Sequence, residues 1–217
     1  MTAENIQSTK ISRNEKRLLI VLATNILIFM TITLLVINAK TDAFDTPISS
    51  FIYTLRTPTT VTTMFFVTRV AGVSGVIIIA SIVSVFLALR YRRAAVFFIV
   101  VFFVSVSVNI LFKLLLKIPR PTLSPLQNLT DFSYPSGHAM NNASLYSLIL
   151  YILYRMGKKR VVKILIIPAT IWVMLIGFSR VFLGSHYISD IIGGITAGVA
   201  IVASFILLLN TYRSLSD

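Results

Sequence analysis

The 217-residue sequence contains no cysteine and little charge. Without cysteine, the chain can form neither disulfides nor metal sites built on thiolates. Only 12% of the residues are charged, whereas 56% are hydrophobic, and the mean hydropathy is +0.88. This composition leaves too little polar surface for a soluble globule of this size. The sequence therefore predicts a membrane protein.

Apolar stretches make up most of the chain. Most of them approach the ~20 residues that a helix needs to cross ~30 Å of hydrocarbon, and the two shorter ones can gain length from their polar flanks. The six stretches cover residues 18–39, 70–89, 94–116, 139–154, 164–178 and 188–209. We therefore predict an all-α fold, a polytopic membrane bundle of six transmembrane helices, which forms one domain over residues 1–217.

The basic residues set the predicted orientation of this bundle. The formal net charge is +13, but no soluble basic domain carries it, so nucleic acid is not an expected partner. Most of the basic residues precede the first stretch, lie between the second and third or the fourth and fifth, or follow the sixth. By the positive-inside rule that side is cytoplasmic. Both termini are then expected inside the cell, with residues 1–17 as a cytoplasmic tail.

The connection over residues 40–60 has apolar side chains at helical spacing. Asp42 and Asp45 lie near its start and Pro47 lies in the expected first turn. This pattern predicts a short amphipathic helix along the extracytoplasmic interface. The alternative is a plain loop that dips into the lipid headgroups.

A small-residue motif lies in the sixth stretch. Gly194 and Gly198 form a GxxxG pattern, which allows two helix backbones to approach closely. In a chain with several spans, this pattern favours packing inside the bundle over dimerisation.

Three polar clusters adjoin the ends of apolar stretches. They are residues 113–121 (KLLLKIPRP), residues 135–138 (PSGH) and residues 179–190 (SRVFLGSHYISD). Counting spans from a cytoplasmic N-terminus places all three on the extracytoplasmic side. The hydropathy pattern did not require this agreement, so it supports one common site. The connection between the first two clusters is also too long and too rich in proline for a simple link between helices.

Three cations in these clusters require an explanation. At contact distance, Lys113, Arg120 and Arg180 would repel one another by up to ~4 kcal/mol per pair at an effective dielectric near 20. Only Asp131 and Asp190 are nearby to offset them. A phosphate dianion fits such a cluster, because guanidinium groups bind its oxygens in pairs. The alternative is that the cations extend separately to the membrane interface.

The polar residues around the two histidines suggest how phosphate would bind and react. Ser136 can cap the fourth helix, and the free amides of its first turn would bind an anion. His186 and Asp190 are four residues apart, hence on one helical face, as in an activated nucleophile with its orienting carboxylate. Taken alone, residues 135–138 could be an ordinary capped helix start. Taken alone, the His186–Asp190 pair could be a structural hydrogen bond.

The three clusters together resemble the signature of the type 2 phosphatidic acid phosphatases. These are integral-membrane lipid phosphate phosphatases whose core is like that of vanadium haloperoxidases. The matching pattern is Lys, six residues, Arg-Pro; then Pro-Ser-Gly-His; then Ser-Arg, five residues, His, three residues, Asp. It covers residues 113–190, and the resemblance points to the bacterial phosphatidylglycerophosphate or undecaprenyl-diphosphate phosphatase type.

This resemblance implies a role for each matching residue. His186 would attack phosphorus, Asp190 would orient it, and His138 would protonate the leaving group. The remaining positions would hold the phosphoryl oxygens, namely Lys113, Arg120, Ser136, Gly137 and Arg180. The resemblance also implies no metal and no other cofactor.

The expected activity is hydrolysis of a lipid phosphate or diphosphate at the extracytoplasmic face through a phosphohistidine. Candidate substrates are undecaprenyl diphosphate, phosphatidylglycerol phosphate and phosphatidic acid, and the expected partners are this lipid and the bilayer. One alternative is transfer of the phosphoryl group to another lipid. Another is a non-catalytic lipid-phosphate binding or transport protein, although binding alone needs no aligned nucleophile. Six apolar spans disfavour haloperoxidase activity.

Overall fold

The computed structural model describes residues 12–216, with side chains through residue 210. These residues form eight α-helices and no strand, which confirms the all-α prediction. The helices are α1 (Arg13–Ile37), α2 (Asp42–Tyr53), α3 (Pro58–Val70), α4 (Val73–Arg90), α5 (Arg92–Leu116), α6 (Gly137–Arg155), α7 (Lys159–Phe182) and α8 (Ile188–Ser216). Of the expected tail, residues 1–11 lie outside the described part, and residues 13–17 belong to α1.

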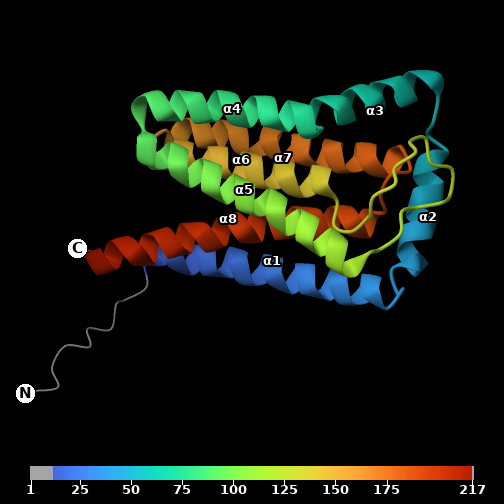
Figure 1. Ribbon diagram of the computed structural model, residues 1–217, viewed down its shortest axis with the longest axis horizontal. Helices are drawn as coiled ribbons and strands as arrows, with labels where there is room; N and C mark the ends of the chain where they lie inside the picture. Colours follow the sequence, from blue (N-terminus) through green and yellow to red (C-terminus); the bar gives the residue numbers. More distant parts are fainter. Residues whose placement is uncertain (1–11, 217) are drawn as a thin grey trace, which may run out of the picture.

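Most of the helices run side by side along the long axis of the molecule (Figure 1). Helices α1, α4, α5, α6, α7 and α8 form this bundle, and α2 lies across one end of it. The long loop between α5 and α6 folds over the same end. The first residues of α1 and the last residues of α8 lie at the opposite end.

The predicted count of six spans is not confirmed. Five described helices are long and apolar enough to cross a membrane: α1, α4, α5, α7 and α8 up to Asn210. Helix α6, the fourth predicted span, is not among them because it carries polar side chains that face its neighbours. Ser144 and Asn142 are buried, and the Ser144 Oγ lies 2.6 Å from the Ser105 Oγ on α5. Polar groups satisfied inside the bundle lower the hydropathy of α6 without exposing it to lipid.

Close packing of α6 on α8 fixes the start of both helices. A Cβ atom added to Gly194 would lie 2.6 Å from the carbonyl oxygen of Ser136, and one added to Gly198 would lie 2.6 Å from that of Met140. Only glycine leaves room for such an approach, so the GxxxG pattern serves internal packing, as predicted. The Ser136 amide also donates a hydrogen bond of 3.0 Å to the Asp190 carbonyl oxygen.

Two short helices lie between the first and second long helices. Helix α2 confirms that residues 40–60 contain a helix, and Pro47 lies inside it. Helix α3 was not predicted, because its five threonines and Arg69 interrupt the apolar pattern. Its start carries clear local signals, since Thr57 caps it and Pro58 is the first helical residue. Helix α3 then leads through Ala71 and Gly72 into α4.

Candidate active site

All eight predicted site residues lie at the end of the bundle that α2 covers. Lys113 lies in the last turn of α5, and Arg120 follows in the long loop. The start of α6 supplies Ser136, Gly137 and His138. Arg180 comes from the last turn of α7, and His186 and Asp190 come from the turn into α8 and its first turn. The structure thus places the three sequence clusters around one point.

His186 and Asp190 form a buried pair. The Nδ1 atom of His186 lies 3.1 Å from Oδ2 of Asp190, and each residue is only 1% exposed. The same Oδ2 accepts hydrogen bonds from the Tyr187 amide and from the hydroxyl of Ser133. With Nδ1 protonated toward the carboxylate, Nε2 retains its lone pair. The sequence prediction did not include Ser133, which holds the carboxylate from the loop side.

The environment of His186 keeps its imidazole neutral. Burial lowers its pKa well below the usual value of 6.5, and the positive charges of Arg120, Arg180 and Lys113 lower it further. Its Nε2 lies 3.2 Å from Nη1 of Arg120, which acts as the donor to the neutral ring. The lone pair that a nucleophile would use therefore already faces a guanidinium group.

Asp131 bridges two of the three predicted cations. Its Oδ2 lies 2.8 Å from Nζ of Lys113, and its Oδ1 lies 2.7 Å from Nη2 of Arg120. Burial alone would raise the pKa of Asp131, but the hydrogen bonds and charges of Lys113 and Arg120 lower it to about 2. Arg120 also donates to the Ser185 carbonyl oxygen at 2.6 Å. Asp131 thus holds both cations beside the turn that carries His186.

Arg180 has a different environment. It is 3% exposed, and its Nη1 donates to Oγ1 of Thr68 at 2.8 Å and to Oε1 of Gln127 at 2.9 Å. Both partners are neutral, and no described carboxylate forms an ion pair with Arg180. Its Nε is buried and has no hydrogen-bond partner among the described residues. A buried guanidinium without a counter-charge is costly, so the site is suited to bind an anion here.

His138 and Arg180 line one cavity of about 640 Å³. The end of α3 supplies part of its wall, with Thr68 and Arg69. A Cβ atom added to Gly72, just beyond α3, would lie 3.6 Å from Nε2 of His138. These α3 residues were missed in the sequence because they lie far from the three clusters. The one visible signal was Arg69, a charge next to an apolar stretch.

The start of α6 has the capped form that its sequence predicts. The hydroxyl of Ser136 accepts a hydrogen bond of 3.5 Å from the Ala139 amide. A Cβ atom added to Gly137 would lie 2.9 Å from Oδ1 of Asn109, whose Nδ2 donates to the Pro135 carbonyl oxygen at 3.1 Å. Glycine therefore lets α5 support the turn that leads into α6.

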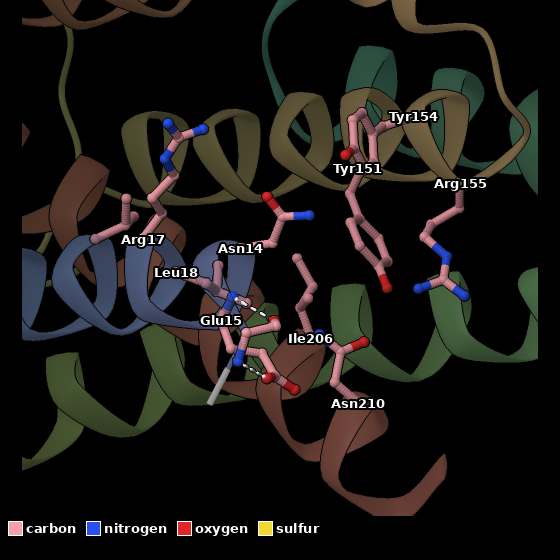
Figure 2. Close-up of a pocket in the computed structure, with 11 residues that line it drawn as sticks. Asn14, Glu15, Arg17, Leu18, Tyr151, Tyr154, Arg155, Ile206 and Asn210 are labelled. Carbon is pink, nitrogen blue, oxygen red and sulfur yellow. Dashed lines mark hydrogen bonds between the residues drawn. The ribbon is translucent and has the colours of Figure 1, made fainter. Parts of the chain in front are cut away.

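A second cavity, of about 550 Å³, lies at the opposite end of the bundle. It is formed by α1, α6 and α8, and Figure 2 shows Tyr151 and Arg155 of α6 on one side of it and Glu15 and Leu18 of α1 on the other. The dashed lines in Figure 2 mark the two hydrogen bonds between Ser12 and Glu15 that cap α1. None of the predicted site residues lines this cavity, so the candidate site is confined to the other end.

Comparison with known families gives a match to the PAP2 superfamily over residues 75–214, which is more than half of the sequence. The chain belongs to the PAP2 superfamily. The predicted resemblance to type 2 phosphatidic acid phosphatases is therefore confirmed. All eight predicted site residues lie within the matched range, whereas α2 and α3 precede it.

Two curated proteins are similar to parts of the chain. Phosphatidylglycerophosphatase B of Bacillus subtilis (strain 168) is 39% identical over 84 residues, which are 37% of this chain and 40% of that protein. Lipid phosphate phosphatase delta of Arabidopsis thaliana is 30% identical over 112 residues, which are 46% of this chain and 26% of that protein. The chain thus matches less than half the length of either relative.

Two crystal structures have a similar fold. The transmembrane PAP2-type phosphatidylglycerolphosphate phosphatase from Bacillus subtilis matches with a TM-score of 0.79 and 25% identity, over 88% of this chain and 96% of that one. Aquifex aeolicus LpxE matches with a TM-score of 0.58 and 18% identity, over 76% of this chain and 94% of that one. The second likeness concerns the fold alone. The first supports the assignment of the chain as a multi-pass membrane protein.

Proposed function

We propose that this chain is a lipid phosphatase that hydrolyses a lipid phosphate or diphosphate at the site of His138 and His186. The observation that carries this proposal is Arg180, a buried cation that has no acidic partner among the described side chains and that lines the same cavity as His138. The neutral His186, held by Asp190, supplies a nucleophile beside these groups. A site that only binds an anion would not need this aligned imidazole.

In the first step, the Nε2 lone pair of His186 attacks phosphorus. A P–N bond forms and the bond from phosphorus to the leaving oxygen breaks. His138, which takes up a proton when the negatively charged phosphate binds beside it, gives that proton to the leaving oxygen, which departs as the lipid alcohol, or as the lipid monophosphate when the substrate is a diphosphate. Asp190 holds the Nδ1 proton and stabilises the positive charge that develops on His186.

In the second step, water attacks the phosphohistidine. His138, now neutral, takes a proton from that water while the P–N bond breaks. Inorganic phosphate leaves, and both histidines return to their starting forms. No metal takes part in either step.

The arrangement around Arg120 suggests how substrate binding prepares the nucleophile. Arg120 contacts Nε2 of His186 directly, at 3.2 Å. When a phosphoryl group binds, Arg120 exchanges this contact for a phosphoryl oxygen and Nε2 becomes free to attack. Lys113, Arg180, Ser136 and the Gly137 amide bind the other oxygens. Phosphoryl transfer depends mainly on such positioning and charge stabilisation.

The names of the relatives favour one substrate. The curated Bacillus subtilis relative and the Bacillus subtilis crystal structure are both named for phosphatidylglycerol phosphate, so this lipid is the first candidate here. Undecaprenyl diphosphate and phosphatidic acid are the other candidates. We propose that the site lies on the extracytoplasmic face, because the facing ends of α6 and α7 and their connection, at the other end of the bundle, are rich in basic residues.

The test is phosphate release by the purified protein from a panel of lipid monophosphates and diphosphates. We expect His186→Ala to lose activity by at least about a thousandfold, as expected for removal of a nucleophile. Tyr154→Phe, at the opposite end of the bundle, is the control and should keep the parent rate. Labelled lipid should also leave an acid-labile phosphoryl group on the parent and none on His186→Ala.

Two outcomes would contradict this proposal. If His186→Ala released phosphate as fast as the parent, His186 would not be the nucleophile. If labelled phosphate appeared on a second lipid instead of in solution, the chain would be a phosphotransferase that uses the same intermediate.

A further inference from the structure

Arg69 is a basic residue at the candidate site that belongs to none of the three sequence clusters. It lies in the last turn of α3 and lines the cavity shared by His138 and Arg180. We propose that Arg69 binds a second anionic group of the substrate and so favours lipid headgroups with two anionic groups over those with one. This inference rests on the proposed lipid phosphatase function.

The neighbours of Arg69 fix its position relative to the reacting groups. Thr68, the preceding residue, accepts a hydrogen bond of 2.8 Å from Arg180. Gly72, three residues later, approaches Nε2 of His138. The end of α3 therefore lies directly against two groups, of which Arg180 would hold the scissile phosphate and His138 would protonate its leaving group. Arg69 lies between these two contacts in the sequence.

The charge of Arg69 is not used within the protein. Lys113 and Arg120 are paired with Asp131, whereas the side chain of Arg69 has no hydrogen bond or ion pair with any residue in the described range 12–210. Arg69 is also exposed, in contrast to the buried Arg180. It can therefore contact a ligand group that lies farther out than the scissile phosphate.

The other cavity residues suggest how a lipid would lie. Phe65, Phe66 and Leu129 supply apolar surface, and the Phe66 side chain is largely exposed. A lipid stem can lie along these side chains with its headgroup directed toward His138. A second anion between the stem and the scissile phosphate, or joined directly to that phosphate, would then lie within reach of Arg69.

The competing explanation is that Arg69 only extends to the membrane interface, as isolated basic residues at helix ends often do. It would then attract all anionic lipids to a similar degree. The two explanations differ in selectivity, because a guanidinium that contacts a second anion contributes nothing specific to a lipid without one.

The experiment measures hydrolysis of three lipids in mixed micelles by the parent, Arg69→Gln and Arg69→Lys. The lipids are phosphatidylglycerol phosphate and a prenyl diphosphate, which carry two anionic groups, and phosphatidic acid, which carries one phosphate. We expect Arg69→Gln to lower kcat/KM about tenfold for the first two, mainly through KM, and less than twofold for phosphatidic acid. For the first two lipids, kcat/KM of Arg69→Lys should lie between the values of the parent and Arg69→Gln, because lysine keeps the charge but not the paired donors of arginine.

The matched control is Arg90→Gln, which removes an exposed arginine from the last turn of α4 at the far end of the bundle. This variant should change kcat/KM by no more than twofold for any of the three lipids. Equal losses on all three lipids, or no loss with Arg69→Gln, would overturn the role of Arg69 in selectivity.

A binding measurement separates this inference from the proposed function. Equilibrium binding of phosphatidylglycerol phosphate and phosphatidic acid to the parent and Arg69→Gln needs no turnover. If the parent hydrolyses none of the lipids, the proposed function fails, and a selective tenfold loss of binding would still support Arg69. Unselective binding by the parent would overturn the inference even if hydrolysis is observed.

Discussion

At the scale of single residues, the three predicted cations differ in how their charge is balanced. Lys113 and Arg120 share the carboxylate of Asp131, so most of their expected repulsion is offset inside the protein. Within residues 12–210, Arg180 has only the neutral Thr68 and Gln127 as side-chain partners. The demand for an anion is therefore concentrated on Arg180, a distinction that the sequence spacing alone does not reveal.

Burial of His186 makes the stability of the protein depend on pH. Its pKa is well below 6.5 in the folded state, so below that pH the unfolded chain takes up a proton that folded His186 does not. This linkage lowers the free energy of unfolding by up to about 1.4 kcal/mol per pH unit, until the folded pKa is reached. We expect the thermal midpoint in detergent to fall between about pH 6.5 and about pH 5.

His186→Gln is the comparison for this measurement, because glutamine does not titrate. Its thermal midpoint should fall less steeply than that of the parent over the same pH range, whatever its value at neutral pH. Parallel curves for the two proteins would show that His186 is not held neutral by the fold.

At the scale of helices, α2 holds the start of α8. Asp45 on α2 is 1% exposed, and its carboxylate accepts hydrogen bonds from the amide and hydroxyl of Ser189, at 3.0 and 2.6 Å. Burial raises the pKa of Asp45, and the hydrogen bonds from Ser189 oppose that rise. Ser189 is next to Asp190, so α2 positions the carboxylate that orients His186. A carboxylate is also favourable near the positive end of a helix dipole.

Removal of this link should weaken both folding and catalysis. We expect Asp45→Ala to lower the free energy of unfolding by about 2 kcal/mol, because two buried donors lose a charged acceptor. The start of α8 should then shift, with a fall of about tenfold in kcat, or ~1.4 kcal/mol of barrier, and a smaller change in KM. Thermal unfolding and steady-state kinetics measure the two effects.

Two further variants sharpen this prediction. Asp45→Asn keeps one carbonyl acceptor, so its free energy of unfolding and its kcat should lie between those of the parent and those of Asp45→Ala. Asp42→Asn changes an exposed carboxylate in the same helical turn and should behave like the parent. A loss of stability in Asp45→Ala with unchanged kcat would mean that Asp45 supports the fold without positioning Asp190.

At the scale of the whole molecule, the sequence predicted what depends on local pattern. Apolar runs located the long helices, and the GxxxG pattern indicated the close contact of α6 with α8. Motif spacing identified eight residues that the fold brings to one end. The polar face of α6 was not recognised as interior, because hydropathy does not distinguish buried hydroxyl and amide groups from exposed ones.

Contacts across long stretches of sequence could not be predicted. Thr68 is hydrogen-bonded to Arg180, and Asp45 is hydrogen-bonded to Ser189. The sequence separation of neither pair follows a helical or strand period. Such pairs form only when whole helices pack, and α3 itself was hidden by its threonines. The predicted site therefore lacked the cavity wall supplied by α3 and the support that α2 gives to the start of α8.

The orientation of the molecule in the membrane is a prediction that the cysteine-free chain makes easy to test. Thr122→Cys places a single thiol in the exposed loop at the site end, and Lys158→Cys places one in the connection between α6 and α7 at the other end. Basic residues at the adjoining ends of α6 and α7 favour the retention of this connection in the cytoplasm. In intact bacterial cells, a membrane-impermeant maleimide should therefore label Thr122→Cys, and label Lys158→Cys only after permeabilisation. The parent chain gives the background. The reverse pattern would place His186 and its lipid headgroup on the cytoplasmic side, so that phosphate would be released inside the cell.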